Sequence, residues 1–200
     1  MLRSSSLAWI APALAVAACN GSSPPNSSAA EGESAKVVRP QVSWPAPASL
    51  DRTAVASLAA SGDSSGIQAR IDRSPVPVLV PRDASLTTAA LVVEGEFYAY
   101  SGRGDGIVVA VQGTRAAHRY EGIAAVGPKT PGARRVRGSQ GFVTENEGIR
   151  TASWIENGVA YTADVECSDR KDTRCTDEAY VVDLVESLAY AGGAGARGGR

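Results

Sequence analysis

The chain has 200 residues and a nearly balanced charge, with 20 lysines and arginines against 21 aspartates and glutamates. This balance argues against nucleic acid as a partner, because binding a polyanion requires a basic surface. One histidine and three cysteines without a Cys-x-x-Cys pair form no common zinc motif, so we expect no metal and no cofactor.

The first residues have the order of a secretory signal. Arg3 precedes a short, mostly apolar run, and Pro12 lies inside it. A membrane span requires about 20 apolar residues, and this run is shorter. Residues 1–18 are therefore expected to be removed during export. An ordinary signal peptide is one interpretation, and the residues that end the run suggest another.

Val16-Ala17-Ala18-Cys19 resembles the lipobox of bacterial lipoproteins. The resemblance implies acylation of Cys19 and anchoring of the mature chain in a lipid bilayer, since several acyl chains hold firmly where one does not. Asn20 resembles an outer-membrane address, which implies a domain on the periplasmic side of the outer membrane. Under the alternative interpretation, the cysteine after the signal is incidental.

Four segments are expected from composition. They are the signal at 1–18, the lipidated cysteine and a disordered Ser/Pro/Ala linker at 19–48, one folded domain at 49–192, and a flexible Gly/Arg tail at 193–200. Trp44, near the end of the linker, either docks on the domain or is exposed.

The domain is predicted to begin with helices. Residues 49–62 suit a short helix capped by Ser49 or Asp51, and residues 64–74 suit a second one. Residues 74–81, "SPVPVLVP", carry three prolines of the same parity, so the missing N–H donors lie on one edge of a strand. This pattern predicts an edge strand, with polyproline II as the alternative.

Residues 89–166 read as successive strands. We expect strands at 89–101, with a bulge at Gly95, and at 107–117, then a polar loop containing residues 127–135, and a weaker strand at 136–145. Asn157-Gly158 favours a type I′ turn, which sets the register of a hairpin over residues 148–167. Trp154 then opposes Tyr161, and the two rings stack.

The last element is an amphipathic helix over residues 176–192, capped by Thr176 and ended by Gly192. Cys167 and Cys175 are expected to form a disulfide in an oxidising envelope. The fold class is therefore α+β: an antiparallel meander of about five to six strands, with an N-terminal helix and this C-terminal helix packed on one face. The ending loosely resembles sensor-like domains of envelope lipoproteins, and no site residue follows from that.

Four motifs are candidates for a functional site. "GDSSG" at 62–66 resembles a serine-protease motif but lacks its order of residues, and the RGD tripeptide at 103–105 suits a turn. His118 has no nucleophile near it in sequence. A basic cluster is the remaining candidate for contact with a partner or an anion: Lys129, Arg134, Arg135 and Arg137.

These observations predict a non-enzymatic envelope lipoprotein that binds a protein partner or an envelope component. The alternative is an envelope hydrolase or transferase with an unrecognised site. A third possibility is an inhibitor or immunity-like protein that inserts a loop such as 127–138 into its partner. No catalytic residue is assigned.

Overall fold

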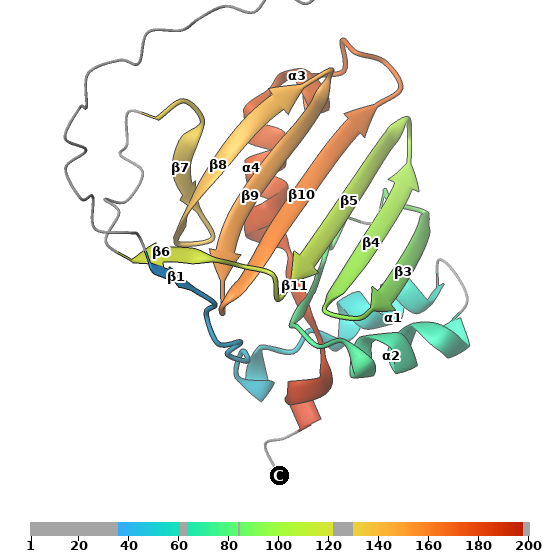
Figure 1. Ribbon diagram of the computed structural model, residues 1–200. Helices are drawn as coiled ribbons and strands as arrows, with labels where there is room; N and C mark the ends of the chain where they lie inside the picture. The colour runs from blue at the N-terminus through green and yellow to red at the C-terminus, as the bar shows by residue number, and fades with distance from the viewer. Residues whose placement is uncertain (1–35, 61–63, 84, 122–129, 198–200) are drawn as a thin grey trace, which may run out of the picture. The chain divides into compact units, whose positions relative to one another are not determined.

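The computed structural model describes residues 36–60, 64–83, 85–121 and 130–197 (Figure 1). All of them belong to one compact unit, Ser34–Arg200, while the unit Met1–Glu33 lies outside the described residues, and Cys19 with it. The prediction of a mainly antiparallel sheet with a few helices is confirmed. The expected five to six strands are too few, because the described residues form eleven.

Seven strands form one sheet, and each neighbouring pair in it is antiparallel. In spatial order they are β3 Thr88–Glu94, β4 Phe97–Gly104, β5 Ile107–Thr114, β10 Val159–Cys167, β9 Ile149–Glu156, β8 Ser139–Asn146 and β7 Ala133–Val136. Side chains alternate between a buried face and an open face along each strand, as in an antiparallel sheet with one solvated side.

Two turns differ from the expectation. Gly95 has φ +50° and occupies a two-residue turn between β3 and β4, so it does not form a bulge. Arg137 and Gly138 both have positive φ and form a second tight turn, which splits the strand expected at 136–145 into β7 and β8. Part of the expected polar loop is therefore strand β7.

The hairpin of β9 and β10 has the predicted register. Asn157 and Gly158 have φ values of +54° and +74°, as a type I′ turn requires. Trp154 lies opposite Tyr161, and their ring centroids are 5.3 Å apart in a stacked arrangement. This local prediction is confirmed in every pair that it named.

The C-terminal helix is shorter than predicted. Helix α4, Glu178–Ser187, follows the short helix α3, Thr173–Thr176, and its N-cap is Asp177, whose side chain accepts a hydrogen bond from the N–H of Ala179. The predicted cap Thr176 is wrong. Beyond Leu188 the chain is extended as β11, Ala189–Gly192, which pairs with β2, Val78–Val80.

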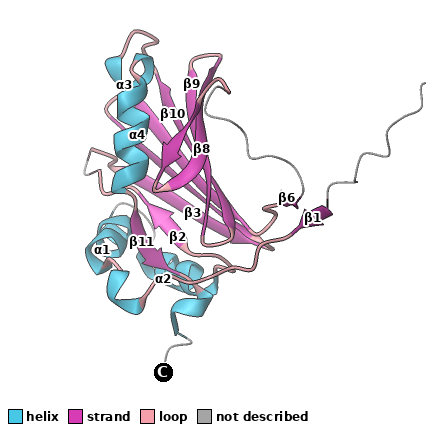
Figure 2. Cartoon of the chain, turned by 90° about the vertical axis from the view of Figure 1, so that its left-hand side faces the viewer, coloured by secondary structure: helices cyan, strands magenta, loops and turns pink. Residues whose placement is uncertain are grey.

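Helix α4 packs on β9 and β10 on the buried side of the sheet, and Figure 2 shows all four α-helices on that side. Helices α1, Arg52–Ala60, and α2, Ser64–Arg73, lie with β2 and β11 beneath the β3–β5 half. Asp51 caps α1 by accepting hydrogen bonds from the N–H groups of Thr53 and Ala54, at 3.0 and 3.1 Å.

The hydrogen-bond partners of strand β2 explain why this segment tolerates three prolines. One of its edges pairs with β11, and the other is completed by tyrosine hydroxyls from the sheet. The Tyr98 hydroxyl donates to the carbonyl of Leu79 and accepts from its N–H, and the Tyr161 hydroxyl donates to the carbonyl of Pro77. The backbone groups of Leu79 lie on the same edge of the strand as those of Pro75, Pro77 and Pro81. This edge is poor in N–H donors, and it faces tyrosine hydroxyls that accept a hydrogen bond only from the N–H of Leu79.

These tyrosines predict a loss of stability in alkali. Burial raises the pKa of Tyr98 and Tyr161 above the ordinary 10.0, and raises that of Tyr100 to about 12. Only the unfolded chain loses these protons just above pH 10, so stability is complete below that pH and falls as pH rises. Each tyrosine contributes a loss of about 1.4 kcal/mol per pH unit until its folded pKa is reached. Urea unfolding followed across this range tests it, and ionisation of all six tyrosines before unfolding would contradict it.

Part of the expected linker is folded. Strand β1, Lys36–Val38, pairs with β6, Arg119–Glu121, in a two-stranded ribbon, and a 3₁₀ turn follows at Pro47–Ser49. Trp44 packs against the chain end, where a Cβ placed on Gly195 would lie 2.1 Å from its ring. The start of the expected tail is thus packed too, and includes the 3₁₀ turn Ala194–Arg197.

The two ends of the sheet differ in what gathers there. At the end that we call the tether end, the ribbon is tied to the turns of the sheet: Arg39 forms an ion pair with Glu96, and the N–H of Ser43 donates to the carbonyl of Asn157 at 2.9 Å. The opposite end, which we call the disulfide end, holds the β4–β5 turn, the β8–β9 turn and residues 167–177.

Candidate functional site

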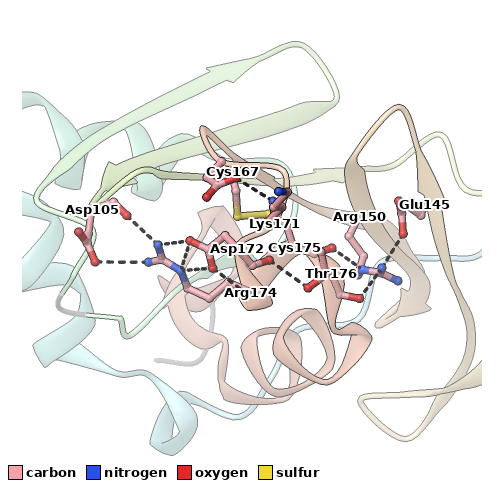
Figure 3. The surroundings of a disulfide bond; sticks show 10 residues. Asp105, Glu145, Arg150, Cys167, Lys171, Asp172, Arg174, Cys175 and Thr176 are labelled. Atoms are coloured by element: carbon pink, nitrogen blue, oxygen red, sulfur yellow. Dashed lines mark hydrogen bonds and ion pairs between the residues drawn. A yellow bond between two sulfur atoms is a disulfide. The ribbon is translucent and has the colours of Figure 1, made fainter.

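The disulfide end brings three segments of the chain together (Figure 3). The predicted disulfide is present, joining Cys167 at the end of β10 to Cys175 in α3, with their Cα atoms 6.1 Å apart. It closes the loop that leads from the sheet to the helical layer. The turns at Asp105 and Glu147 flank this loop.

Arg174 joins the disulfide loop to the β4–β5 turn. Its guanidinium donates to both carboxylate oxygens of Asp172, at 3.0 and 2.6 Å, and to the backbone carbonyl of Asp105 at 2.7 Å. Asp172 also accepts from the N–H of Arg174 and thereby caps α3. The hydrogen bonds from the Arg174 side chain and backbone lower the pKa of Asp172, so this carboxylate stays charged and bound.

Arg150 joins the same loop to the β8–β9 turn. Arg150 is only 9% exposed, and its Nε donates to the carbonyl of Cys175 at 3.0 Å. Nη2 donates to the carbonyl of Thr176 at 3.1 Å and to the carboxylate of Glu145. The guanidinium therefore satisfies carbonyls at the end of α3 that have no partner within so short a helix.

One disulfide and two arginines thus hold three segments in a fixed arrangement. The polar side chains that point to solvent around them are of both signs: Asp105, Glu145, Glu147, Asp169, Arg170 and Lys171. A loop surface held by a rigid scaffold is well suited to recognition, because little conformational freedom is lost when a partner binds. The chemistry available here is hydrogen bonding and charge pairing.

The predicted basic cluster is dispersed. Lys129 lies outside the described residues. Arg134 forms an ion pair with Glu178 of α4, and Arg135 donates to the carbonyl of Gly138 at 2.7 Å. Arg137 is bound to Glu156 and to carbonyls at the end of α4. Arg134 and Arg137 are thus used within the molecule.

The other motifs do not converge either. His118 is exposed at the tether end and forms no hydrogen bond or ion pair within the part of the chain that the structure describes. The serines of "GDSSG" begin α2, and Asp63 lies outside the described residues. The RGD tripeptide ends in the β4–β5 turn, where Asp105 has φ +45°.

The chain matches no protein-family model, no curated protein and no solved structure. None of the helices in the described ranges is long and apolar enough to cross a membrane. Within the same ranges, no group of three or more His, Cys, Asp and Glu side chains is arranged to hold a metal ion.

Sequence reasoning missed both arginines of the disulfide end. Arg150 carried a usable signal, because it has the parity of Ala152 and Trp154 and therefore had to lie on the apolar face of its strand. A charged residue at such a position requires a partner. Arg174 stands next to Cys175 and gave no signal of its own, since its contact with Asp105 joins residues far apart in sequence.

Proposed function

We propose that this chain is a non-enzymatic lipoprotein of the bacterial cell envelope, anchored through Cys19, that binds a partner protein through its disulfide end. The lipobox-like Val16-Ala17-Ala18-Cys19 supports the anchor and a place on the periplasmic side of the outer membrane. The observation that carries the binding role is the joining of three segments by one disulfide and two arginines.

A protein fits this surface better than a polyanion does. Acidic side chains at Asp105, Glu145 and Asp169 stand beside the basic Arg170 and Lys171. A surface with both signs of charge is complementary to another mixed surface, and such complementarity mainly determines specificity and the rate of association. A uniformly negative polymer would be repelled by three of these five groups.

The position of the disulfide end also suits this role. The nine residues of β10 separate it from the tether end by about 30 Å. The chain leads toward Cys19 from Lys36, which lies on the tether-end ribbon. A protein anchored in this way would present the loops of its disulfide end away from the site of attachment.

Position-resolved crosslinking tests the binding role. A photoreactive residue at Lys171 is expected to capture one protein in intact envelopes, whereas the same residue at Asp183, exposed on α4, captures none. The captured protein, once purified, should bind the Arg170→Glu/Lys171→Glu variant at least about tenfold more weakly. The matched control is Arg52→Glu/Arg73→Glu on α1 and α2. Equal weakening by both pairs would contradict the proposal.

The anchor has its own test. Cells given a labelled fatty acid should yield a labelled mature chain, and Cys19→Ser should abolish the label and release the protein from membranes. A Cys167→Ser chain should keep the label, because its lipobox is intact. A mature wild-type chain without label would refute the lipoprotein assignment.

A further inference from the structure

Exposed apolar side chains gather at the tether end. Five large apolar residues are exposed in the described part of the chain, and Tyr120, Val37 and Val92 are the most exposed, at 59%, 53% and 51%. Phe97, at 37%, begins β4 beside the turn at Glu96. Only Ile149 lies at the disulfide end. Such clustering marks an interaction surface, since single exposed apolar residues are normally scattered.

The ribbon of β1 and β6 presents two of these residues side by side. Val37 is the register partner of Tyr120, so the two side chains share one face of the ribbon. The neighbouring pair, Lys36 and Glu121, points to the other face and forms an ion pair at 3.8 Å. One face of the ribbon is therefore apolar and free of charge.

The ribbon projects from the open face of the sheet. Figure 2 shows β1 and β6 on the side away from the helices. Arg119 and Tyr120 of β6 line a hollow there of about 680 Å³, together with Phe142 of β8 and Ile155 of β9. Phe97 lines an adjoining hollow that shares Ala160 and Thr162 with the first one. Val92 lies on the same open face, within β3 and diagonally across the β3–β4 pair from Phe97.

The charges around this surface are slightly basic. Lys36 and Arg39 are neutralised by Glu121 and Glu96. Arg115, Arg119 and the acidic Glu94, which lies opposite Phe97, are exposed and form no ion pair within the described ranges, which leaves one net positive charge. Arg119 pairs with Val38 and so lies on the ribbon face opposite Tyr120, at the border of the apolar surface. An exposed tyrosine among apolar residues with arginines at the border is typical of surfaces that lie at the interface of an anionic bilayer.

The path of the chain indicates that a bilayer, rather than another protein, contacts this surface. The lipid anchor expected at Cys19 is separated from Lys36 by residues 20–35 alone, a length of at most about 55 Å. The ribbon is therefore the first described element that the anchor reaches, and attachment greatly raises the local concentration of bilayer around it. No such argument favours a second copy or another protein.

We propose that the tether-end surface, formed by Val37, Tyr120, Phe97 and Val92 with Arg115 and Arg119, contacts the anionic bilayer in which the chain is anchored. The inference rests on the proposed function for the anchor and adds a second, non-covalent contact. It fixes which way the domain faces: the tether end lies on the lipid, and the disulfide end points into the periplasm.

Depth-dependent quenching tests the contact on the acylated mature protein. In vesicles containing brominated phosphatidylglycerol, Tyr120→Trp should show quenched fluorescence above the wild-type background. Ile149→Trp, the matched exposed position at the disulfide end, should not. Equal quenching at both positions, or none at either, would overturn the proposal, and the second result would leave the ribbon to a protein or a second copy.

A second measurement separates this contact from the anchor. The mature chain carrying Cys19→Ser has no acyl group, and it should still bind phosphatidylglycerol vesicles. Val37→Ser/Tyr120→Ser should weaken that binding at least about tenfold, while Ile149→Ser should not. Near-ultraviolet circular dichroism of the Trp154–Tyr161 stack confirms that each variant is folded. Vesicle binding that persists unchanged in the double variant would refute the surface, whatever fatty-acid labelling shows about Cys19.

Discussion

Arg137→Met is expected to lower the free energy of unfolding by about 2–4 kcal/mol, the largest effect of any single polar substitution considered. Arg137 lies in the β7–β8 turn, and its side chain is 17% exposed. Nε donates to Glu156 at 2.6 Å, and Nη1 donates to the carbonyls of Val185 and Leu188, at 2.9 and 3.2 Å. One guanidinium thus joins the sheet to the end of α4.

Loss of this group leaves several partners without hydrogen bonds. Glu156, whose side chain is 22% exposed, would keep, among the described residues, only the indole N–H of Trp154 as a donor, at 3.0 Å. The carbonyls at the end of α4 would lose their donors where β11 leaves little access for water. Because both side chains retain some contact with solvent, the expected cost lies at the lower end of that for a buried pair.

Urea denaturation measures the effect as a change in midpoint at constant slope. Arg135→Met is the matched control, for which we expect a change within about 0.5 kcal/mol. Arg135 is exposed on β7, and within the described residues its side chain donates only to the Gly138 carbonyl. Arg137→Met/Glu156→Gln should cost less than the sum of the single changes, because removing one partner already breaks the pair. Equal effects of Arg137→Met and Arg135→Met would show that the contacts are unimportant.

Replacing both disulfide cysteines, Cys167→Ser with Cys175→Ala, is expected to lower stability by about 2–3 kcal/mol, on the chain-entropy account of a loop of nine residues. The loss of partner binding should exceed what this loss of folding stability alone would cause. Without the bond, the orientation of Asp172 and Arg174 depends on hydrogen bonds alone. We expect crosslinking from Lys171 to fall in parallel.

Two variants distinguish a loss of folding stability from a loss of the loop arrangement at the disulfide end. Arg174→Gln keeps the disulfide but removes the ion pair with Asp172 and the bond to the Asp105 carbonyl, so it should weaken partner binding with little change in the unfolding midpoint. Val143→Ala on β8 destabilises the core without touching the loops and should leave crosslinking from Lys171 intact in the folded protein. Loss of crosslinking in the Val143 variant would show that stability alone controls binding.

Local interactions decided the elements that the sequence predicted correctly. The Asn157–Gly158 turn requires two positive φ angles, and once the turn is placed, every pair of the hairpin follows, including Trp154 with Tyr161. Asp51 bonds N–H groups two and three residues away, so the start of α1 is encoded within one helical turn. The disulfide was predicted from the two cysteines of the domain together with the expectation of an oxidising envelope, and the pair lies within bonding distance.

The tertiary structure alone decided where α4 ends. Residues 188–192 carry a helical apolar pattern, yet they pair as β11 with β2, because the backbone groups of β2 need a partner that no nearby residue supplies. Arg137 at the end of α4 and Arg150 in the disulfide end depend in the same way on carbonyls from distant segments. Strand parity places Arg150 on the apolar face, but it does not identify the partners of either arginine, since which carbonyls lack a donor is known only once the helices have ended and packed.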